Sequence, residues 1–313
     1  MHGVNPIKTP GSERLIPRLA QMLDGWRKSD PPVEKKLPVE VDVPDYLVKL
    51  GLAPEATPLV KAVGDLAMVA FYYLLRVGEY TCKGTRNESK QTVQFHGRNV
   101  TFFKRNKRGQ LVQMSREASD EEIMEADSAT LRLENQKNGW QGVCINHEHN
   151  DDEIFSPVRA LGRRILHIRS HGGEGWQDLP ISTVFTKGEP KGVTDKNIRT
   201  ALKLAAAALD YPARGMPIDR IDTHSLRGGG ANALSLAGYS DTQIQKMGRW
   251  RGETFKTYIR EQLSNFSVGM SKSMKKMFGF VNVEGGTGIG YDITASVIGM
   301  EYNVGVSNGA SAE

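Results

Sequence analysis

The sequence predicts a mainly helical α+β protein with a small antiparallel β-sheet. Most of the chain falls into segments whose apolar residues recur at helical spacing. Between the early and the late helical segments, two stretches combine strand-like residues with turn residues, as β-hairpins do. With 313 residues, the chain can hold one large or two small domains and bury a substantial core.

The N-terminal part, residues 1–55, is expected to be a short helical region. Its apolar residues fit an amphipathic helix over residues 12–26, and a charged connector with prolines follows at 28–44. Residues 58–75 are largely apolar, which predicts a buried helix with Arg76 at its C-terminal end. Taken alone, such an arginine would only satisfy the last carbonyl groups of the helix.

Two hairpins are expected next. Residues 100–112 place a strongly basic tip, with Lys104 and Lys107, between two strands. That tip either contacts a DNA backbone or is a solvated turn. Residues 130–146 form the second hairpin around Lys137, and a lysine at such a tip is usually a solvated surface charge.

Two polar stretches lie beside the second hairpin. Residues 115–127 are acidic and are expected to be an exposed insertion. Residues 147–152 hold two histidines and three acids, which raises the alternative of a metal site. Because adjacent side chains in a polar loop rarely close around one ion, we predict a loop there and no metal.

The helical pattern resumes in the second half of the chain. Residues 156–170 begin with a serine cap and an early proline and carry a basic face. On that face, Arg163 and Arg164 are candidates for contacts to DNA phosphates. A loop at residues 185–190 and an alanine-rich helix at residues 194–209 are expected to follow.

The most informative stretch is residues 223–260. His224 and Arg227 stand three apart, so they share one face of a helix and make a donor-rich surface suited to a phosphodiester. Glycines at 228–230 each cost about 1 kcal/mol in a helix relative to alanine, which predicts the close approach of another backbone. A short capped helix is expected at 242–247.

Trp250 then precedes Tyr258, which lies on a further expected helix. This order of His-x-x-Arg, Trp and Tyr resembles the C-terminal half of the tyrosine recombinase, or phage integrase, family. The Gly-Arg-Trp before Tyr-Ile-Arg is most similar to recombinases of DIRS-type retrotransposons and Crypton-like mobile elements. Upstream, the family's arginine with an acid three residues later matches Arg76 and Glu79. Its hairpin lysine matches Lys137, with Lys104 and Lys107 as the alternatives.

The resemblance implies the fold of a tyrosine recombinase catalytic domain over residues 56–267. Residues 1–55 would be a remnant of the family's core-binding domain, and residues 268–313 a tail that is first basic and then Gly-rich. The implied activity is that of a site-specific DNA recombinase or integrase. Such an enzyme cuts and rejoins DNA strands through a 3′-phosphotyrosine intermediate, here to integrate or excise a mobile element.

The resemblance also assigns roles to the matched residues. Tyr258 would attack phosphorus, and Arg76 and Arg227 would hold the non-bridging oxygens on which charge develops. Lys137 would protonate the leaving 5′ oxygen. His224 would help to hold the phosphate and manage the proton of the tyrosine.

Two further residues would support this group. Trp250 would donate its indole N–H to a phosphate oxygen, or serve as a core residue at a helix junction. Glu79 would orient Arg76 or His224 from behind. The scheme needs no metal and no cofactor, because the phosphotyrosine itself conserves the energy of the broken bond.

Charge and composition agree with a DNA partner. The chain has 41 Lys and Arg and 36 Asp and Glu, a net charge of +5. Four of the acids and none of the basic residues fall in residues 281–313, so the rest carries +9. A basic body favours a polyanion, and the family implies double-stranded DNA bound by a homo-oligomer, usually a tetramer.

Only two cysteines, Cys82 and Cys144, are present, and no stretch resembles a secretory signal or a membrane span. The expected protein is therefore intracellular and bound to DNA, without a membrane partner, and nuclear if its host is eukaryotic. Two alternatives stay open: a type IB topoisomerase-like nicking and closing enzyme, and a recombinase-derived DNA-binding protein that does not cut.

Overall fold

The computed structural model describes residues 7–9, 14–29, 36–82, 92–134, 142–252 and 256. The helices are α1 (Pro17–Ser29), α2 (Asp42–Gly51), α3 (Pro58–Tyr72), α4 (Val77–Tyr80), α5 (Asp120–Met124), α6 (Pro157–Gly172), α7 (Asp195–Ala208), α8 (His224–Leu236) and α9 (Asp241–Gly248). The strands are β1 (Val100–Arg105), β2 (Leu111–Gln113), β3 (Ser128–Arg132), β4 (Cys144–Glu148), β5 (Thr183–Thr186) and β6 (Glu189–Gly192). Short 3-10 helices occupy Gly97–Asn99, Gly173–Asp178, Pro212–Arg214 and Ile218–Arg220.

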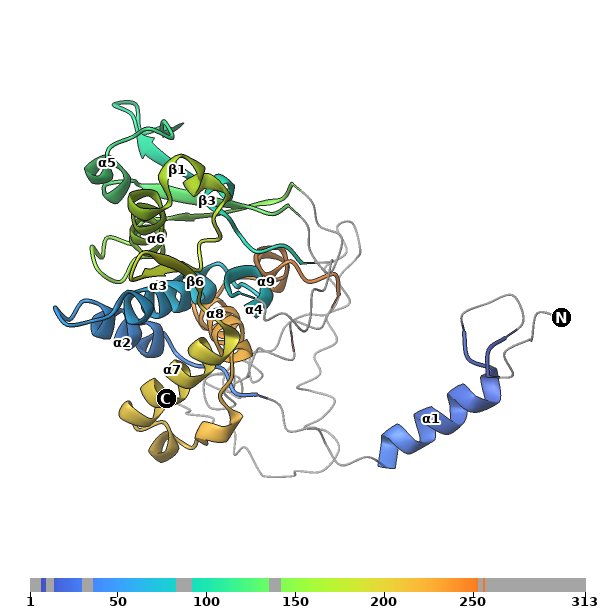
Figure 1. The fold of residues 1–313 in the computed structure, drawn as a ribbon. Coiled ribbons are helices and arrows are strands. Elements are labelled where there is room, and N and C mark those ends of the chain that lie inside the picture. Colours follow the sequence, from blue (N-terminus) through green and yellow to red (C-terminus); the bar gives the residue numbers. More distant parts are fainter. Residues whose placement is uncertain are drawn as a thin grey trace, which may run out of the picture. The chain divides into compact units, whose positions relative to one another are not determined.

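The architecture is mainly α with a small antiparallel sheet, as the sequence predicts. The sheet has the strand order β2-β1-β3-β4, and β5 and β6 form a separate hairpin. Helix α6 contacts the sheet through β3 and β4 and packs on α3, while α2, α7 and α8 contact α3 as well (Figure 1). Helix α3 is therefore the centre of the fold.

The sequence of α3 explains its central place. Thr57 caps it by accepting a hydrogen bond from the backbone N–H of Val60 at 3.3 Å, and Pro58 occupies its first turn. Residues 62–71 are all buried, so the helix contacts neighbours on every side. It ends at Tyr72, three residues before the predicted end, and Arg76 is the N-cap residue of α4 instead.

Residues that precede residue 55 belong to the hydrophobic core. Val43, Leu47 and Val48 of α2 are buried in the same hydrophobic cluster as α3, and Val39 N donates to the carbonyl of Ser225 at 3.1 Å. The prediction that residues 1–55 stand apart as an N-terminal region is therefore wrong for residues 36–55. The helix expected at 12–26 is present as α1, displaced toward the C-terminus.

The two predicted hairpins are confirmed. Strand β1 pairs with β2 in the register Arg105 to Leu111, and β3 pairs with β4 in the register Thr130 to Asn146. Lys107 lies in the exposed turn between β1 and β2. The tip that carries Lys137 lies outside the described residues.

Two segments predicted to be irregular contain regular structure. Residues 115–127 include α5 with its buried Ile123, and Ala126 just after the helix is buried as well, so this stretch is part of the body and not only an exposed insertion. Residues 185–190 were expected to be a loop, but they lie within the β5–β6 hairpin. Residues 147–152 were also expected to be a loop, but the first two belong to β4.

His147 of β4 is a partly buried histidine beside the end of α3. Its Nε2 lies 2.7 Å from the carbonyl oxygen of Tyr72, and its ring centroid is 4.7 Å from that of Tyr73. Burial lowers the pKa of its imidazole to about 4, against the opposing hydrogen bond to Tyr72. The side chain is therefore neutral in the folded protein and donates from Nε2 to the carbonyl.

Because the pKa of His147 is lowered in the folded protein, we expect the protein to lose stability in acid. Above pH 6.5 His147 is neutral in both states, whereas below it the unfolded chain binds a proton that the folded chain takes up only near pH 4. The free energy of unfolding should fall by up to about 2 kcal/mol between pH 7 and pH 5. Urea unfolding of His147→Gln should show this part of the pH dependence removed, and an unchanged slope would contradict the assignment.

Candidate functional site

Helix α8 starts at His224 and carries the two donor residues of the predicted motif. His224 is exposed in the first turn, whereas the side chain of Arg227 is only 3 % exposed. The first turn of a helix has unsatisfied N–H groups and the positive end of the helix dipole. His224 thus faces solvent at the anion-attracting end of α8, and Arg227 points into the body.

The glycines of α8 let two backbones approach it. A Cβ atom on Gly229 would overlap the carbonyl oxygen of Val39, and one on Gly230 would overlap that of Phe71. The close backbone approach predicted for residues 228–230 is confirmed. It places α8 directly against α3 and the strand-like segment that precedes α2.

Arg227 is held by the last residue of α9 and by Trp250 just after that helix. Its Cζ lies 4.4 Å from the ring centroid of Trp250, a cation–π contact, and its Nη2 donates to the carbonyl oxygen of Gly248. Trp250 is 8 % exposed and packs in a small cluster with Leu74, Ala231 and Ile244. The expected role of Trp250 as a core residue at a helix junction is confirmed.

Glu79 is fully buried and binds two arginines. Its Oε1 lies 3.2 Å from Arg76 Nη1, and its Oε2 accepts from the backbone N–H of Arg76 at 3.0 Å. The Arg76 side chain is 23 % exposed, so a ligand can reach it. Of the two partners expected for Glu79, Arg76 is the one that it contacts.

The second arginine on Glu79 is Arg249, to which sequence reasoning gave no role. Its Nη2 donates to Glu79 Oε2 at 3.0 Å, and the pair is 1 % and 0 % exposed. Its guanidinium also donates to the carbonyl oxygens of Tyr73 at 3.2 Å and Leu74 at 3.1 Å. Burial lowers the pKa of this guanidinium, and the nearby Glu79 opposes that shift.

The predicted motif has an upstream part with Arg76 and a downstream part with Arg227. Both parts contact one short segment, residues 248–250. Gly248 and Trp250 hold Arg227, and Arg249 between them binds the same carboxylate as Arg76. The two arginines predicted to clamp a phosphate are thus connected through three consecutive residues. Tyr258 and Lys137 lie outside the described residues.

The predicted DNA-contacting residues differ in their surroundings. Arg164 is 2 % exposed and donates to the carbonyl oxygens of Ile181 and Thr183, so its prediction as a phosphate contact is wrong. Arg163 donates to buried Asp65 at 2.7 Å, and the side chain of the arginine is 22 % exposed. A basic pattern on a helix does not distinguish an arginine that binds carbonyls inside the fold from one that faces solvent.

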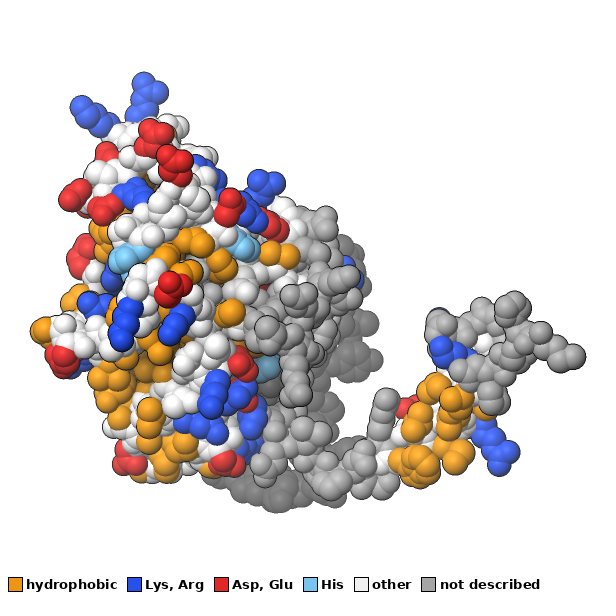
Figure 2. Space-filling model, viewed as in Figure 1, with side chains coloured by type: hydrophobic (Ala, Val, Ile, Leu, Met, Phe, Trp, Pro, Cys, Tyr) orange, Lys and Arg blue, Asp and Glu red, His pale blue; other side chains and the backbone are white. Residues whose placement is uncertain are grey.

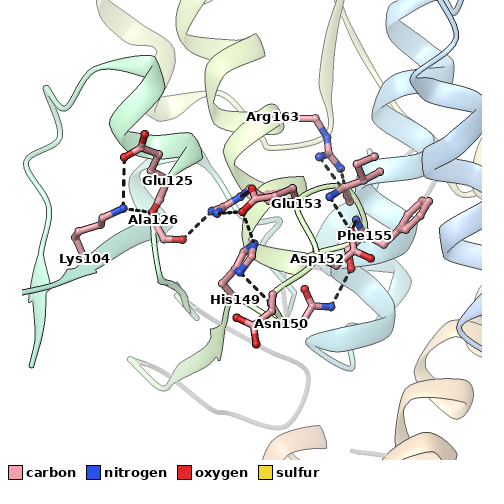
Figure 3. A network of polar contacts seen from close by, with 12 residues as sticks. Lys104, Glu125, Ala126, His149, Asn150, Asp152, Glu153, Phe155 and Arg163 are labelled. Carbon is pink, nitrogen blue, oxygen red and sulfur yellow. Dashed lines mark hydrogen bonds and ion pairs between the residues drawn. The ribbon is translucent and has the colours of Figure 1, made fainter. Parts of the chain in front are cut away.

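Lys104 and the histidine-rich stretch take part in contacts within the chain (Figure 3). Lys104 Nζ donates to the carbonyl oxygen of Glu125 and lies 3.5 Å from its carboxylate. His149 accepts from the N–H of Asp151 at 3.0 Å and lies 3.8 Å from Glu153. Among the described residues, no group of three or more His, Cys, Asp or Glu side chains is arranged to hold a metal ion.

A hollow of about 650 Å³ lies where β3 ends, at the loop end of the β3–β4 hairpin. Its lining residues are Arg98, Asn99, Arg116, Arg132, Leu133, Glu134 and Gly142. Arg98 is paired with Glu134 at 2.7 Å and with Asp178 at 2.5 Å, whereas Arg132 is exposed at the end of β3. Sequence reasoning missed this hollow, because its arginines come from separate elements.

Elsewhere on the viewed face, acidic and basic side chains are interspersed over the sheet and α5 (Figure 2). Within the part of the chain that the structure describes, no helix is long and apolar enough to cross a membrane.

Comparison with known proteins gives distant likenesses. No protein-family model matches the chain, and no curated protein does. The chain is similar to a structure of the Tn1549 transposon integrase in complex with transposon right end DNA, with 12 % identity and a TM-score of 0.40 over 78 % of this chain and 68 % of that one. It is also similar to the same integrase in complex with circular intermediate DNA, with 10 % identity and a TM-score of 0.42 over 82 % and 76 %. These values are too low to assign the chain to a family.

Proposed function

We propose that this chain is a tyrosine recombinase that cuts and rejoins double-stranded DNA through a 3′-phosphotyrosine. The observation that carries the proposal is the joining of Arg76 and Arg227 at residues 248–250, just before Tyr258 in the sequence. Two fixed cations suit a phosphodiester whose non-bridging oxygens gain charge during transfer. The substrate is the DNA that takes part in integration or excision of a mobile element of the DIRS or Crypton kind, bound by a tetramer.

The chemistry balances without an outside reactant. The phenol oxygen of Tyr258 forms a bond to phosphorus while the bond to the 5′ oxygen breaks. Lys137 protonates that leaving oxygen, and exposed His224 takes up the proton of the phenol. The reverse step, with a 5′ hydroxyl of another strand as nucleophile, rejoins the DNA and frees the tyrosine.

One observation favours a second candidate, a recombinase-derived DNA-binding protein that does not cut. Arg227 is 3 % exposed, with Trp250 over its face and one N–H engaged by Gly248. An arginine covered in this way must be uncovered before it meets a phosphate, and a chain that never uncovers it would bind without cleaving. A cleavage assay separates the two candidates.

That assay uses nicked duplexes from a randomised pool. When the protein cuts a strand near the nick, the short fragment with the 5′ hydroxyl dissociates, so the strand cannot be rejoined and the protein stays covalently attached. The recombinase should give a protease-sensitive band of reduced mobility on a denaturing gel. A protein that shifts the same DNA on a native gel and gives no such band would support the non-cleaving binder.

We further propose that exposed Lys107 and Arg132, which lie beyond opposite ends of the β1–β3 pairing, contact the DNA backbone. Lys107→Ala and Arg132→Ala should each weaken binding several-fold and lower the slope of log affinity against log salt by about 1. Fluorescence anisotropy between 50 and 200 mM salt, roughly the range over which such contacts respond, measures both. Lys49→Ala, an exposed lysine of α2, is the control; equal salt slopes for all three variants would contradict the proposal.

A further inference from the structure

We propose that Arg249 is a positioning residue that fixes Arg76 and Arg227 relative to each other. Its effect on catalysis rests on the proposed function, whereas its effect on the structure of the site does not. Three acceptors surround its guanidinium: Glu79 Oε2 at 3.0 Å and the carbonyl oxygens of Tyr73 at 3.2 Å and Leu74 at 3.1 Å.

These acceptors belong to two different structural features. The carbonyls of Tyr73 and Leu74 follow directly on the end of α3, where a helix leaves unsatisfied acceptors and the negative end of its dipole. Glu79 belongs to α4 and also binds Arg76. Arg249 therefore binds the chain on both sides of Arg76, at residues 73–74 before it and at Glu79 after it.

The backbone is strained in both segments that meet here, the one after α3 and the one after α9. Leu74 has φ +49° and Arg249 has φ +58°, the left-handed region that side chains with a Cβ rarely adopt. The hydrogen bond from Arg249 to Leu74 O joins these two residues, and the Leu74 side chain packs in the cluster that contains Trp250. Strain held by mutual contacts is a sign that the two segments must meet in one geometry.

The neighbours of Arg249 transmit its position to Arg227. Gly248 accepts the hydrogen bond of Arg227, and Trp250 lies against its guanidinium. A displacement of Arg249 therefore moves both supports of Arg227 and releases Glu79 from its second partner. A lysine keeps the charge but lacks the planar fork that reaches several acceptors at once.

The test compares Arg249→Lys and Glu79→Gln with wild type on nicked duplex DNA at saturating protein. The rate of covalent adduct formation in a single turnover should fall about 100-fold, as a displacement of about 1 Å from reacting geometry produces. DNA affinity should stay within about threefold of wild type, because other contacts to the phosphate backbone supply most of it. A wild-type rate in Arg249→Lys would overturn the proposal.

Arg164→Lys is the matched control, since Arg164 is a buried arginine that donates to two backbone carbonyls far along the chain from residues 248–250. Circular dichroism first establishes a temperature at which all variants are folded. At that temperature Arg164→Lys should keep the wild-type rate although its melting temperature falls. An equal loss of rate in Arg164→Lys would show that the effect is general destabilisation, and this too would overturn the proposal.

A second readout does not require activity. Hydrogen exchange followed by mass spectrometry should show faster exchange in Arg249→Lys at residues 74–80 and 244–252 together, with strands β1 and β3 unchanged. If wild type forms no adduct, the proposed function fails, and this experiment alone still decides the positioning role. Faster exchange in only one of the two segments, or throughout the chain, would contradict it.

Discussion

Tyr258→Phe is expected to abolish covalent attachment to DNA while leaving DNA binding near the wild-type level. The phenol oxygen is the proposed nucleophile, so its removal leaves nothing to form the bond to phosphorus. The loss should be complete within detection, at least about 1000-fold, as for removal of a catalytic nucleophile in other enzymes. The measurement is the protease-sensitive band on a denaturing gel, beside a native gel for binding.

Tyr239→Phe is the control for this variant. Tyr239 is 51 % exposed and lies just after α8, so its hydroxyl can be removed without disturbing the core. It should form the adduct at the wild-type rate. An adduct that persists in Tyr258→Phe would show that another side chain is the nucleophile.

Gly229→Ala is expected to have the largest effect on stability. The added methyl group would overlap the carbonyl oxygen of Val39 and crowd the ring of Phe71, and the Val39 backbone cannot move aside as a flexible side chain could. The free energy of unfolding should fall by about 3 kcal/mol or more. Urea unfolding at neutral pH measures the change, and loss of soluble protein on expression would agree with it.

Gly175→Ala is the matched control, because its added Cβ meets nothing within 4 Å. Its stability should remain within about 0.5 kcal/mol of wild type, as for ordinary surface substitutions. If Gly229→Ala were as stable as Gly175→Ala, α8 would not pack on residues 36–41 as described.

Local patterns predicted much of this fold. The pairing of β1 with β2 followed from turn residues between strand-like runs, and the short capped helix expected at residues 242–247 corresponds to α9. The contact between Arg76 and Glu79 agrees with one of the two roles that the family resemblance implied for Glu79. The glycines of α8 predicted a close backbone because their cost in a helix needs a compensating contact.

What the patterns did not predict depends on contacts between distant segments. Arg164 looks like a surface residue in sequence, and only the carbonyls of Ile181 and Thr183 explain its burial. Arg249 forms its ion pair with Glu79, 170 residues away. Helix α2 was missed because its proline and its acids hid the spacing of Val43, Leu47 and Val48.

The position at which DNA is attached to the protein decides whether Tyr258 is the nucleophile. After the adduct forms, nuclease and trypsin digestion followed by mass spectrometry identifies the peptide that carries the residual nucleotide. We expect a nucleotide phosphate on Tyr258 within the peptide of residues 257–260. A nucleotide on any other residue, or binding to DNA with no modified peptide at all, would contradict this expectation.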